Sequence, residues 1–327
     1  MQLLRSAKRT FSPQVGVTVA SSSNMAELYG TLQRLNRLKS TEQSGLTLMG
    51  LGDYWLVQAI QSELIEPLKL PEATLNQLAS QWLSLVQRND QGDPSETGQL
   101  WGAPYRWGST VLIYRKDKLD ALPGAVEDWD MLWNPALSQR VGLLNQPREV
   151  IGMVLKTLGQ SYNDGNPMAR SQLREKLRSL HQQTRLYSSK NYIEPLILGD
   201  IWVAMGWSSD VIPALSQDKN LGVIFPKSGS ALWADLWVKA KGGVNDQADF
   251  PVDKFITQWV KYWWSPDVAS DILKFTHAAP VISTPSAEPE KNALWTPSNF
   301  EVSEFLLPLG KDAIDQYQSL WLEMRQA

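Results

Sequence analysis

A tryptophan and an aspartate, Trp233 and Asp235, lie two residues apart in an apolar run of the sequence. Residues two apart in a β-strand point to the same face. An aromatic ring beside a fixed carboxylate suits a bound cation, and an amine in particular. An isolated acid in an apolar strand is costly unless it is paired. We therefore expect Asp235 either to face a ligand cleft or to meet a basic partner.

The amino-terminal part of the chain has the alternating pattern of an α/β fold. Valines at every second position predict a strand over residues 15–19, and the polar turn 21–24 then caps a helix. A short strand over residues 46–49, broken by Gly50-Leu51-Gly52, leads into a second helix that begins at residues 53–55. This β-α-β-α order indicates a parallel sheet with ligands at the carboxyl ends of its strands.

The rest of the chain continues this alternation. A long strand over residues 102–114, with a Gly-Ser interruption, is a segment that can cross between two lobes. Pro147 stands near the first position of a predicted helix. Further predicted elements are a helical turn at 128–133, strands at 141–144, 201–205 and 222–225, and helices at 173–180, 252–263, after 265–267 and at 311–326.

Composition excludes several classes of function. A chain of 327 residues predicts two lobes, and its apolar share of 43% with a charged share of 20% is that of a globular protein. A net charge of −3 gives no reason to expect a nucleic-acid partner. No apolar run long enough for a membrane span is visible.

Cysteine and histidine, the usual metal ligands and nucleophiles, are absent or rare, whereas tryptophan is abundant. The absence of cysteine removes disulfides, thiolate metal sites and cysteine nucleophiles. Only His181 and His277 supply imidazole, so we expect no metal and no cofactor. Fifteen tryptophans are present. Most must be core, and a surplus is left for ligand walls.

Six motifs in collinear order resemble the spermidine/putrescine-binding proteins of ABC transporters, which are type II periplasmic solute-binding proteins of extracellular solute-binding family 1. The resemblance covers nearly the whole chain. The motifs are Tyr54-Trp55, Pro104-Tyr105-Arg106-Trp107-Gly108-Ser109, Trp129-Asp130-Met131-Leu132-Trp133, Pro147-Arg148-Glu149-Val150-Ile151-Gly152, Met205-Gly206-Trp207 and Leu232-Trp233-Ala234-Asp235.

This resemblance implies an α/β, two-lobed type II fold with a hinged cleft between the lobes. The lobes are expected at residues 1–109 with 235–282 and at 110–234 with 283–327. The implied ligand-binding residues are Tyr54, Glu149, Trp207, Trp233 and Asp235, with Asp235 as the main anchor. Two positions depart from the family pattern, since Gln146 replaces an acid and Ala279 lies where a tyrosine is expected nearby.

The amino terminus is a further departure. The family begins with a strand and an aromatic turn, whereas this chain starts inside what resembles the following helix, so the first strand is expected to be missing. The basic start lacks an apolar signal region. A misassigned start is our preferred explanation, and a family member that truly lacks this strand is the alternative.

The expected function is that of a monomeric, periplasmic binding component that delivers a polyamine to ABC permease subunits and is not an enzyme. Core packing competes with ligand binding for Trp207 and Trp233. Helix-start stabilisation competes for Glu149, which we expect to keep its charge, and Asp53 is assigned to helix capping. The alternatives are another solute (a sugar, an amino acid or a betaine), a glycosidase-like enzyme using Asp235 and Glu149, or an interaction factor.

Overall fold

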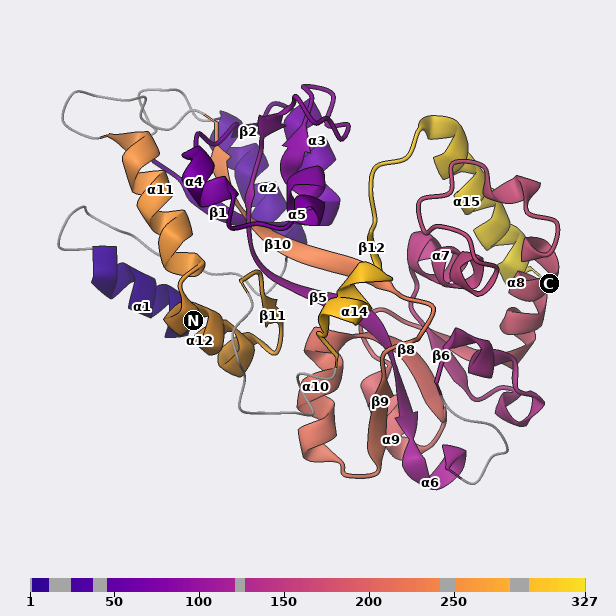
Figure 1. The fold of residues 1–327 in the computed structure, drawn as a ribbon. Helices are drawn as coiled ribbons and strands as arrows, with labels where there is room; N and C mark the ends of the chain where they lie inside the picture. Colours follow the sequence, from indigo (N-terminus) through magenta and orange to yellow (C-terminus); the bar gives the residue numbers. More distant parts are fainter. Residues whose placement is uncertain are drawn as a thin grey trace. The chain divides into compact units, whose positions relative to one another are not determined.

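The computed structural model describes residues 2–11, 25–37, 46–120, 127–241, 251–282 and 294–326. The chain divides into two compact units (Figure 1). Unit 1 is Met1–Trp107 with Trp233–Ser286, and unit 2 is Gly108–Leu232 with Ala287–Ala327. Two of the boundaries fall inside long strands, β5 (Ala103–Arg115) and β10 (Ala231–Ala240). The predicted long strand is therefore confirmed as β5.

Unit 1 contains a sheet in the order β1-β10-β5. The register of β1 (Leu48–Gly52) on β10 places Gly52 opposite Asp235. β1 and the short strand β2 (Ile65–Glu66) run antiparallel to β10, and β11 (Ala279–Pro280) runs antiparallel to β5. For these pairings the expectation of a parallel sheet is wrong, because the strand returning from unit 2 enters the sheet between β1 and β5.

The glycines at the end of β1 lie within the strand, so the predicted break at Gly50 is wrong. A Cβ at Gly50 would lie 3.4 Å from Tyr105 Oη, and one at Gly52 would lie 3.9 Å from Asp235 Oδ1. Both distances are ordinary van der Waals contacts, so it is the pairing with β10 that keeps these glycines in the strand. The strand predicted at residues 15–19 and its turn at 21–24 lie outside the described residues.

The helices of unit 1 agree with the sequence pattern, including those predicted from residues 25, 53, 252 and 265. Ser265 caps its helix by accepting a hydrogen bond from Val268 N–H. Two further short strands, β3 (Gln87–Arg88) and β4 (Gln99–Leu100), form a separate pair. The helices are α1 (Gln2–Phe11), α2 (Met25–Arg37), η1 (Asp53–Trp55), α3 (Leu56–Gln61), α4 (Glu72–Leu75), α5 (Ser80–Val86), α11 (Val252–Trp263) and α12 (Pro266–Thr276).

Aromatic side chains fill the core of unit 1. Trp237 on β10 stacks on Tyr105 with 4.9 Å between ring centroids, and Trp259 and Trp263 of α11 pack against it at 5.2 and 5.0 Å. Phe11 of α1 packs on this helix. Across the chain eight of the 15 tryptophans are buried. The prediction that most tryptophans pack in cores is confirmed, and the other seven are half-buried.

Unit 2 has a sheet in the order β5-β8-β6-β7, with β9 (Leu221–Ile224) also on β5. β8 (Val203–Trp207) is antiparallel to β5, whereas β6 (Val141–Leu143) is parallel to both β8 and β7 (Thr184–Tyr187). The parallel arrangement predicted from the β-α-β pattern is confirmed for these three strands. Their carboxyl ends lead to Glu149 and Trp207.

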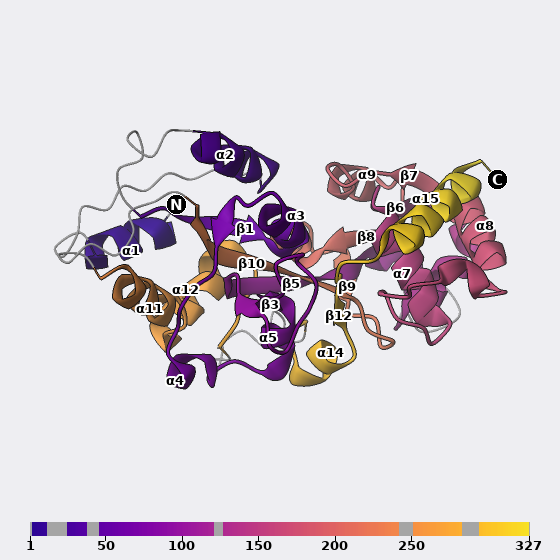
Figure 2. The same cartoon turned by 90° about the horizontal axis from the view of Figure 1, so that it is seen from above.

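Helices of unit 2 cover this sheet. α15 packs against α7 and α8, as Figures 1 and 2 show. Pro147 stands at the start of α7, as predicted, and Gly159 adopts φ 69° just beyond its end. The helices are α6 (Lys116–Leu119), η2 (Trp129–Trp133), η3 (Pro135–Leu137), α7 (Pro147–Thr157), η4 (Pro167–Ala169), α8 (Leu173–Gln183), α9 (Ile193–Leu198), α10 (Ser208–Gln217), α14 (Pro297–Glu301) and α15 (Lys311–Arg325).

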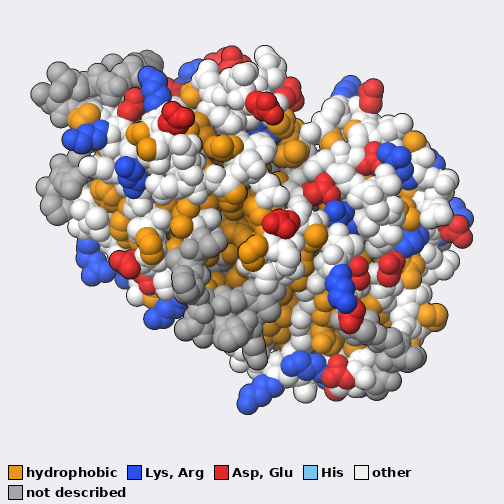
Figure 3. Space-filling model, viewed as in Figure 1, with side chains coloured by type: hydrophobic (Ala, Val, Ile, Leu, Met, Phe, Trp, Pro, Cys, Tyr) orange, Lys and Arg blue, Asp and Glu red, His pale blue; other side chains and the backbone are white. Residues whose placement is uncertain are grey.

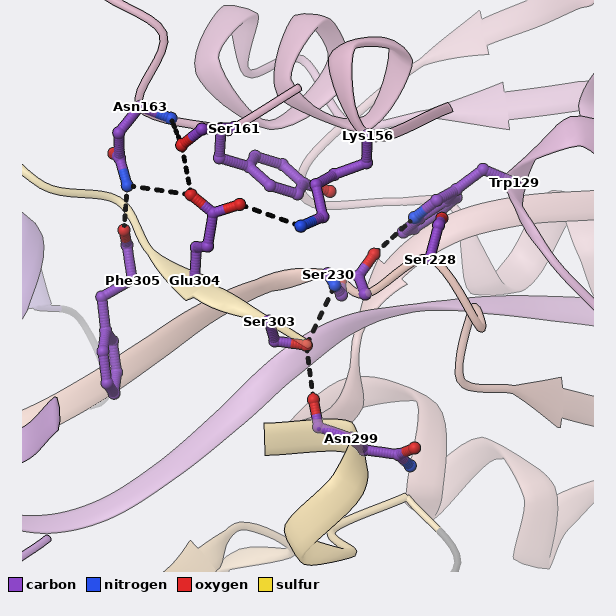
Figure 4. Close-up of polar contacts among 12 residues, drawn as sticks. Trp129, Lys156, Ser161, Asn163, Ser228, Ser230, Asn299, Ser303, Glu304 and Phe305 are labelled. Atoms are coloured by element: carbon purple, nitrogen blue, oxygen red, sulfur yellow. Dashed lines mark hydrogen bonds and ion pairs between the residues drawn. The ribbon is translucent and has the colours of Figure 1, made fainter. Parts of the chain in front are cut away.

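A polar cluster joins the C-terminal segment to the rest of unit 2 (Figure 4). Glu304 on β12 (Glu304–Phe305) accepts hydrogen bonds from Lys156 Nζ at 2.9 Å and from the hydroxyl of Ser161. Asn163 donates to the carbonyl of Phe305 at 2.9 Å. β12 is thereby tied to α7 and to the loop that follows it.

The same segment supports the start of β10. β12 pairs in parallel with Ala231 and Leu232. The N–H of Ser230 donates to Ser303 Oγ at 3.0 Å, and Trp129 Nε1 donates to the carbonyl of Gly229 at 2.9 Å (Figure 4). These contacts fix the backbone where β10 leaves unit 2.

The surface shows no large field of one charge on the face drawn in Figure 3, where acidic and basic side chains are interspersed among the described residues. None of the helices in the described ranges is both long and apolar enough to cross a membrane.

The packing of α7 yields a stability prediction. A Cβ at Gly152 would overlap the buried ring of Tyr162, so we expect Gly152→Ala to destabilise the chain by about 1–3 kcal/mol. Gly165→Ala is the control, since a Cβ there meets no atom within 4 Å. Urea denaturation compares the two variants, and an equal stability of both would contradict this packing.

Candidate functional site

Glu149 is a buried carboxylate at the start of α7, directly after β6. Its exposed fraction is 7%. Oε2 accepts a hydrogen bond from Thr110 Oγ1 at 2.7 Å, and Oε1 accepts one from Trp207 Nε1 at 3.1 Å. The structure therefore brings two predicted site residues, Glu149 and Trp207, into direct contact in unit 2.

The charge of Glu149 is held by hydrogen bonds but not neutralised. Among the described residues no Lys, Arg or His forms a salt bridge with it. Burial raises the pKa of Glu149, although the hydrogen bonds from Thr110 and Trp207 and the charge of Arg148 oppose that rise. Desolvation therefore opposes the stabilisation of the charged form that we expected from the helix start.

Trp207 is fixed from its backbone as well as from its ring. Its N–H donates to Tyr192 Oη at 3.0 Å, and Tyr192 donates to Asp210 Oδ2 at 2.8 Å. A Cβ at Gly206 would overlap the Tyr192 ring, so only glycine allows this approach. A half-buried indole is thus held in one orientation beside a buried carboxylate.

Asp235, the strongest sequence candidate, has a basic partner in unit 1. Arg106 Nε and Nη2 both lie 2.6 Å from Asp235 Oδ2. Asp235 is 5% exposed, and burial raises its pKa although Arg106 acts in the opposite direction. The sequence left open whether this acid meets a base or faces a cleft, and a base is present. The sequence analysis did not single out Arg106 as this basic partner, although its position in an apolar strand was a visible signal.

Asp53 is a second acid beside Asp235 that the sequence assigned to helix capping. Its Oδ1 accepts a hydrogen bond from the N–H of Tyr54 at 3.0 Å, which supports the local turn. Burial, followed by the charge of Asp235, raises the pKa of Asp53 to about 7, against backbone hydrogen bonds from Ala234 and Tyr54. The proximity depends on the register of β1 on β10, which the sequence does not specify.

Two aromatic residues complete this group in unit 1. Tyr54 is 69% exposed and meets the edge of Trp55 at 5.5 Å. Trp233 is half-buried, and its indole N–H has no hydrogen-bond partner among the described residues. Unit 1 therefore carries Tyr54, Trp233 and Asp235 near one another along β1 and β10, while Glu149 and Trp207 form a separate group in unit 2.

The chemistry of both groups suits a cationic solute. Buried carboxylates can bind an ammonium group through their charge, and half-buried indoles can bind it through the ring face. Within the described ranges no cluster of three or more His, Asp or Glu side chains could hold a metal ion.

Comparison with known proteins agrees with this chemistry. A putrescine/cadaverine-binding protein of Pseudomonas aeruginosa is 32% identical over 160 residues, which is 46% of this chain and 45% of that protein. The putrescine-binding periplasmic protein PotF of Escherichia coli is 27% identical over 309 residues, covering 86% of this chain and 79% of that protein. The alignment covers 49% of a spermidine/putrescine-binding periplasmic protein of Salmonella typhimurium. The chain therefore spans about half the length of the Pseudomonas and Salmonella relatives.

The fold has a counterpart among solved structures. The spermidine/putrescine ABC transporter substrate-binding protein PotD of Streptococcus pneumoniae superposes with a TM-score of 0.77 over 99% of this chain and 94% of that one, at 19% identity. The architecture is therefore the mixed α/β, type II fold of substrate-binding proteins. The family model described as bacterial extracellular solute-binding protein matches residues 11–297, and the chain belongs to this family.

The raised pKa of Asp53 gives a pH-dependent prediction. The pKa of about 7 in the folded chain lies above the ordinary value of 3.8 for an aspartate, so the folded chain binds more protons and loses stability as the pH rises through this interval. We expect Asp53→Asn to raise the free energy of unfolding at pH 8 by more than about 1 kcal/mol, and to change it less at pH 5.

Urea denaturation at the two pH values measures this difference. Asp90→Asn, at an exposed aspartate of unit 1, is the control and should leave the pH dependence unchanged. The same pH dependence in wild type and Asp53→Asn would show that Asp53 does not carry the buried charge.

Proposed function

We propose that this chain is the substrate-binding component of an ABC importer and that it captures a polyamine such as putrescine or spermidine. The observation that supports this most is Glu149, a buried carboxylate that is hydrogen-bonded by Trp207 and Thr110 and forms no salt bridge among the described residues. Burying an acid without a counter-charge is costly. An ammonium group of the ligand would supply that charge.

The contact with Trp207 would add to the binding energy. A cation beside an indole contributes about 0.5–2 kcal/mol, and more where water is excluded. The indole N–H already donates a hydrogen bond to Glu149, so the ligand would contact the face of the ring. The methylene chain of a polyamine is apolar and fits against such a surface.

Unit 1 would contribute Tyr54, Trp233 and Asp235, with Asp53 as an additional acid. Because Asp235 is paired with Arg106, the main anchor in this proposal is Glu149 and not Asp235. The names of the relatives from Pseudomonas and Escherichia, which bind putrescine or cadaverine, support an amine ligand.

The partners and the compartment belong to the same proposal. We propose that the chain works in the periplasm as a monomer, delivers its ligand to permease subunits and catalyses no reaction. The periplasmic relatives and the ABC-transporter protein of the same fold support this role. Neither a nucleic-acid partner nor a cofactor is part of the proposal.

Removal of the Glu149 charge tests the proposal. We expect Glu149→Gln to lower the affinity for putrescine by about 30-fold or more, since loss of a buried charge partner costs about 2–5 kcal/mol. Isothermal titration calorimetry gives the dissociation constants. Glu175→Gln, an exposed glutamate on α8 in the same unit, should bind as wild type does, and equal affinity in both variants would contradict the role of Glu149.

A thermal-shift screen tests the class of ligand. We expect putrescine, cadaverine and spermidine to raise the melting temperature, because a ligand that binds only the folded state stabilises it. Neutral sugars and betaine should not. Stabilisation by a neutral sugar with none by any polyamine would replace the proposal with another solute.

A further inference from the structure

The ion pair between Arg106 and Asp235 changes the charge that unit 1 presents. Both short contacts, from Arg106 Nε and Nη2, reach the same oxygen of Asp235. Two charge-assisted hydrogen bonds hold a carboxylate firmly. An ammonium group near Asp235 therefore meets an acid that is already neutralised.

We propose that Arg106 is a specificity-determining residue that, by neutralising Asp235, limits the number of ammonium groups that unit 1 binds and favours a diamine over a triamine. This inference rests on the proposed polyamine function and narrows its substrate class. It concerns Arg106, which lies in the strand β5 and in none of the ligand-binding positions implied by the family resemblance.

The local charges of unit 1 support this limit. Asp53 and Asp235 are the acids near the end of β1, and Arg106 and the buried Arg88 act on them with the opposite charge. Arg88 Nε donates a hydrogen bond to the carbonyl of Leu85 at 2.7 Å. Arg106 pairs with Asp235, whereas Asp53 forms no salt bridge among the described residues and is the acid left for an ammonium.

Arg106 would also act on the ligand directly. A quarter of its side-chain surface is exposed, compared with 7% for the side chain of Asp235. An ammonium placed beside this pair would approach the guanidinium as well as the carboxylate. Like charges in a partly desolvated environment repel each other, which disfavours an additional ammonium here.

Four proteins test the inference: wild type, Arg106→Met, Asp235→Asn and the double variant. Calorimetry with putrescine and with spermidine gives the ratio of the two affinities. In Arg106→Met, Asp235 is left without its cation, and we expect the ratio to shift toward spermidine by about tenfold, the size of one hydrogen bond to a charged group. In Asp235→Asn, the unpaired guanidinium should shift the ratio toward putrescine.

The double variant separates charge balance from direct contact. It removes both charges of the pair, so its ratio should equal that of wild type. If instead the double variant and Asp235→Asn both lose binding of putrescine and of spermidine, the carboxylate itself is the required contact and the inference is overturned. An unchanged ratio in Arg106→Met also overturns it.

Two controls complete the design. Arg106→Lys keeps a positive charge and should retain the wild-type ratio, and Arg37→Met changes an exposed arginine at the end of α2. Thermal melting identifies folded variants, and Asp235→Asn with the double variant still decides the question if Arg106→Met does not fold. Wild type that binds no amine contradicts the proposed function, whereas amine binding with unchanged ratios contradicts only the role of Arg106.

Discussion

Burial of carboxylates is the constraint on which the rest of this structure depends. Glu149, Asp235 and Asp53 are each largely removed from water, and burial is the largest cause of the raised pKa in all three. The chain compensates in different ways. Asp235 has a guanidinium, Asp53 has backbone donors, and Glu149 has an indole and a hydroxyl. A cationic ligand could neutralise an acid that has hydrogen bonds and no salt bridge.

The positions of the strand ends bring the candidate site residues of each unit together. In unit 2 the carboxyl ends of β6 and β8 bring Glu149 and Trp207 together, and in unit 1 the register of β1 on β10 brings Asp53 to Asp235. Strand register is strongly specified where side chains are buried. The aromatic core around Trp237 and the polar cluster around Glu304 support this register, since they fix β10 at its two ends.

Much of the fold could be predicted from the sequence. Hydrophobic periodicity located β5, α7 and α11, and the capping residues Pro147 and Ser265 located helix starts. The direction of β10 in its sheet could not be predicted, because periodicity carries no information about which strand is a neighbour. The end of β1 was misplaced because glycine is disfavoured in strands, whereas Gly50 and Gly52 are paired with β10 here.

Prediction of the candidate site was more uneven. Residue type and family resemblance singled out Tyr54, Glu149, Trp207, Trp233 and Asp235, and the structure places Glu149 and Trp207 in contact. Arg106 and Asp53 could not be placed, since their importance arises from pairs more than 100 residues apart in the chain. The sign of the pKa shift at Glu149 was also beyond the sequence, because it depends on the degree of burial.

Calorimetry of putrescine binding in two buffers of different ionisation enthalpy tests the central claim most directly. An ammonium group that binds beside acids of raised pKa lowers those pKa values. Because the pKa of Asp53 is about 7, binding near pH 7 should release protons. The account predicts saturable binding with net proton release. Binding without proton release, or no binding of any diamine or triamine, would contradict it.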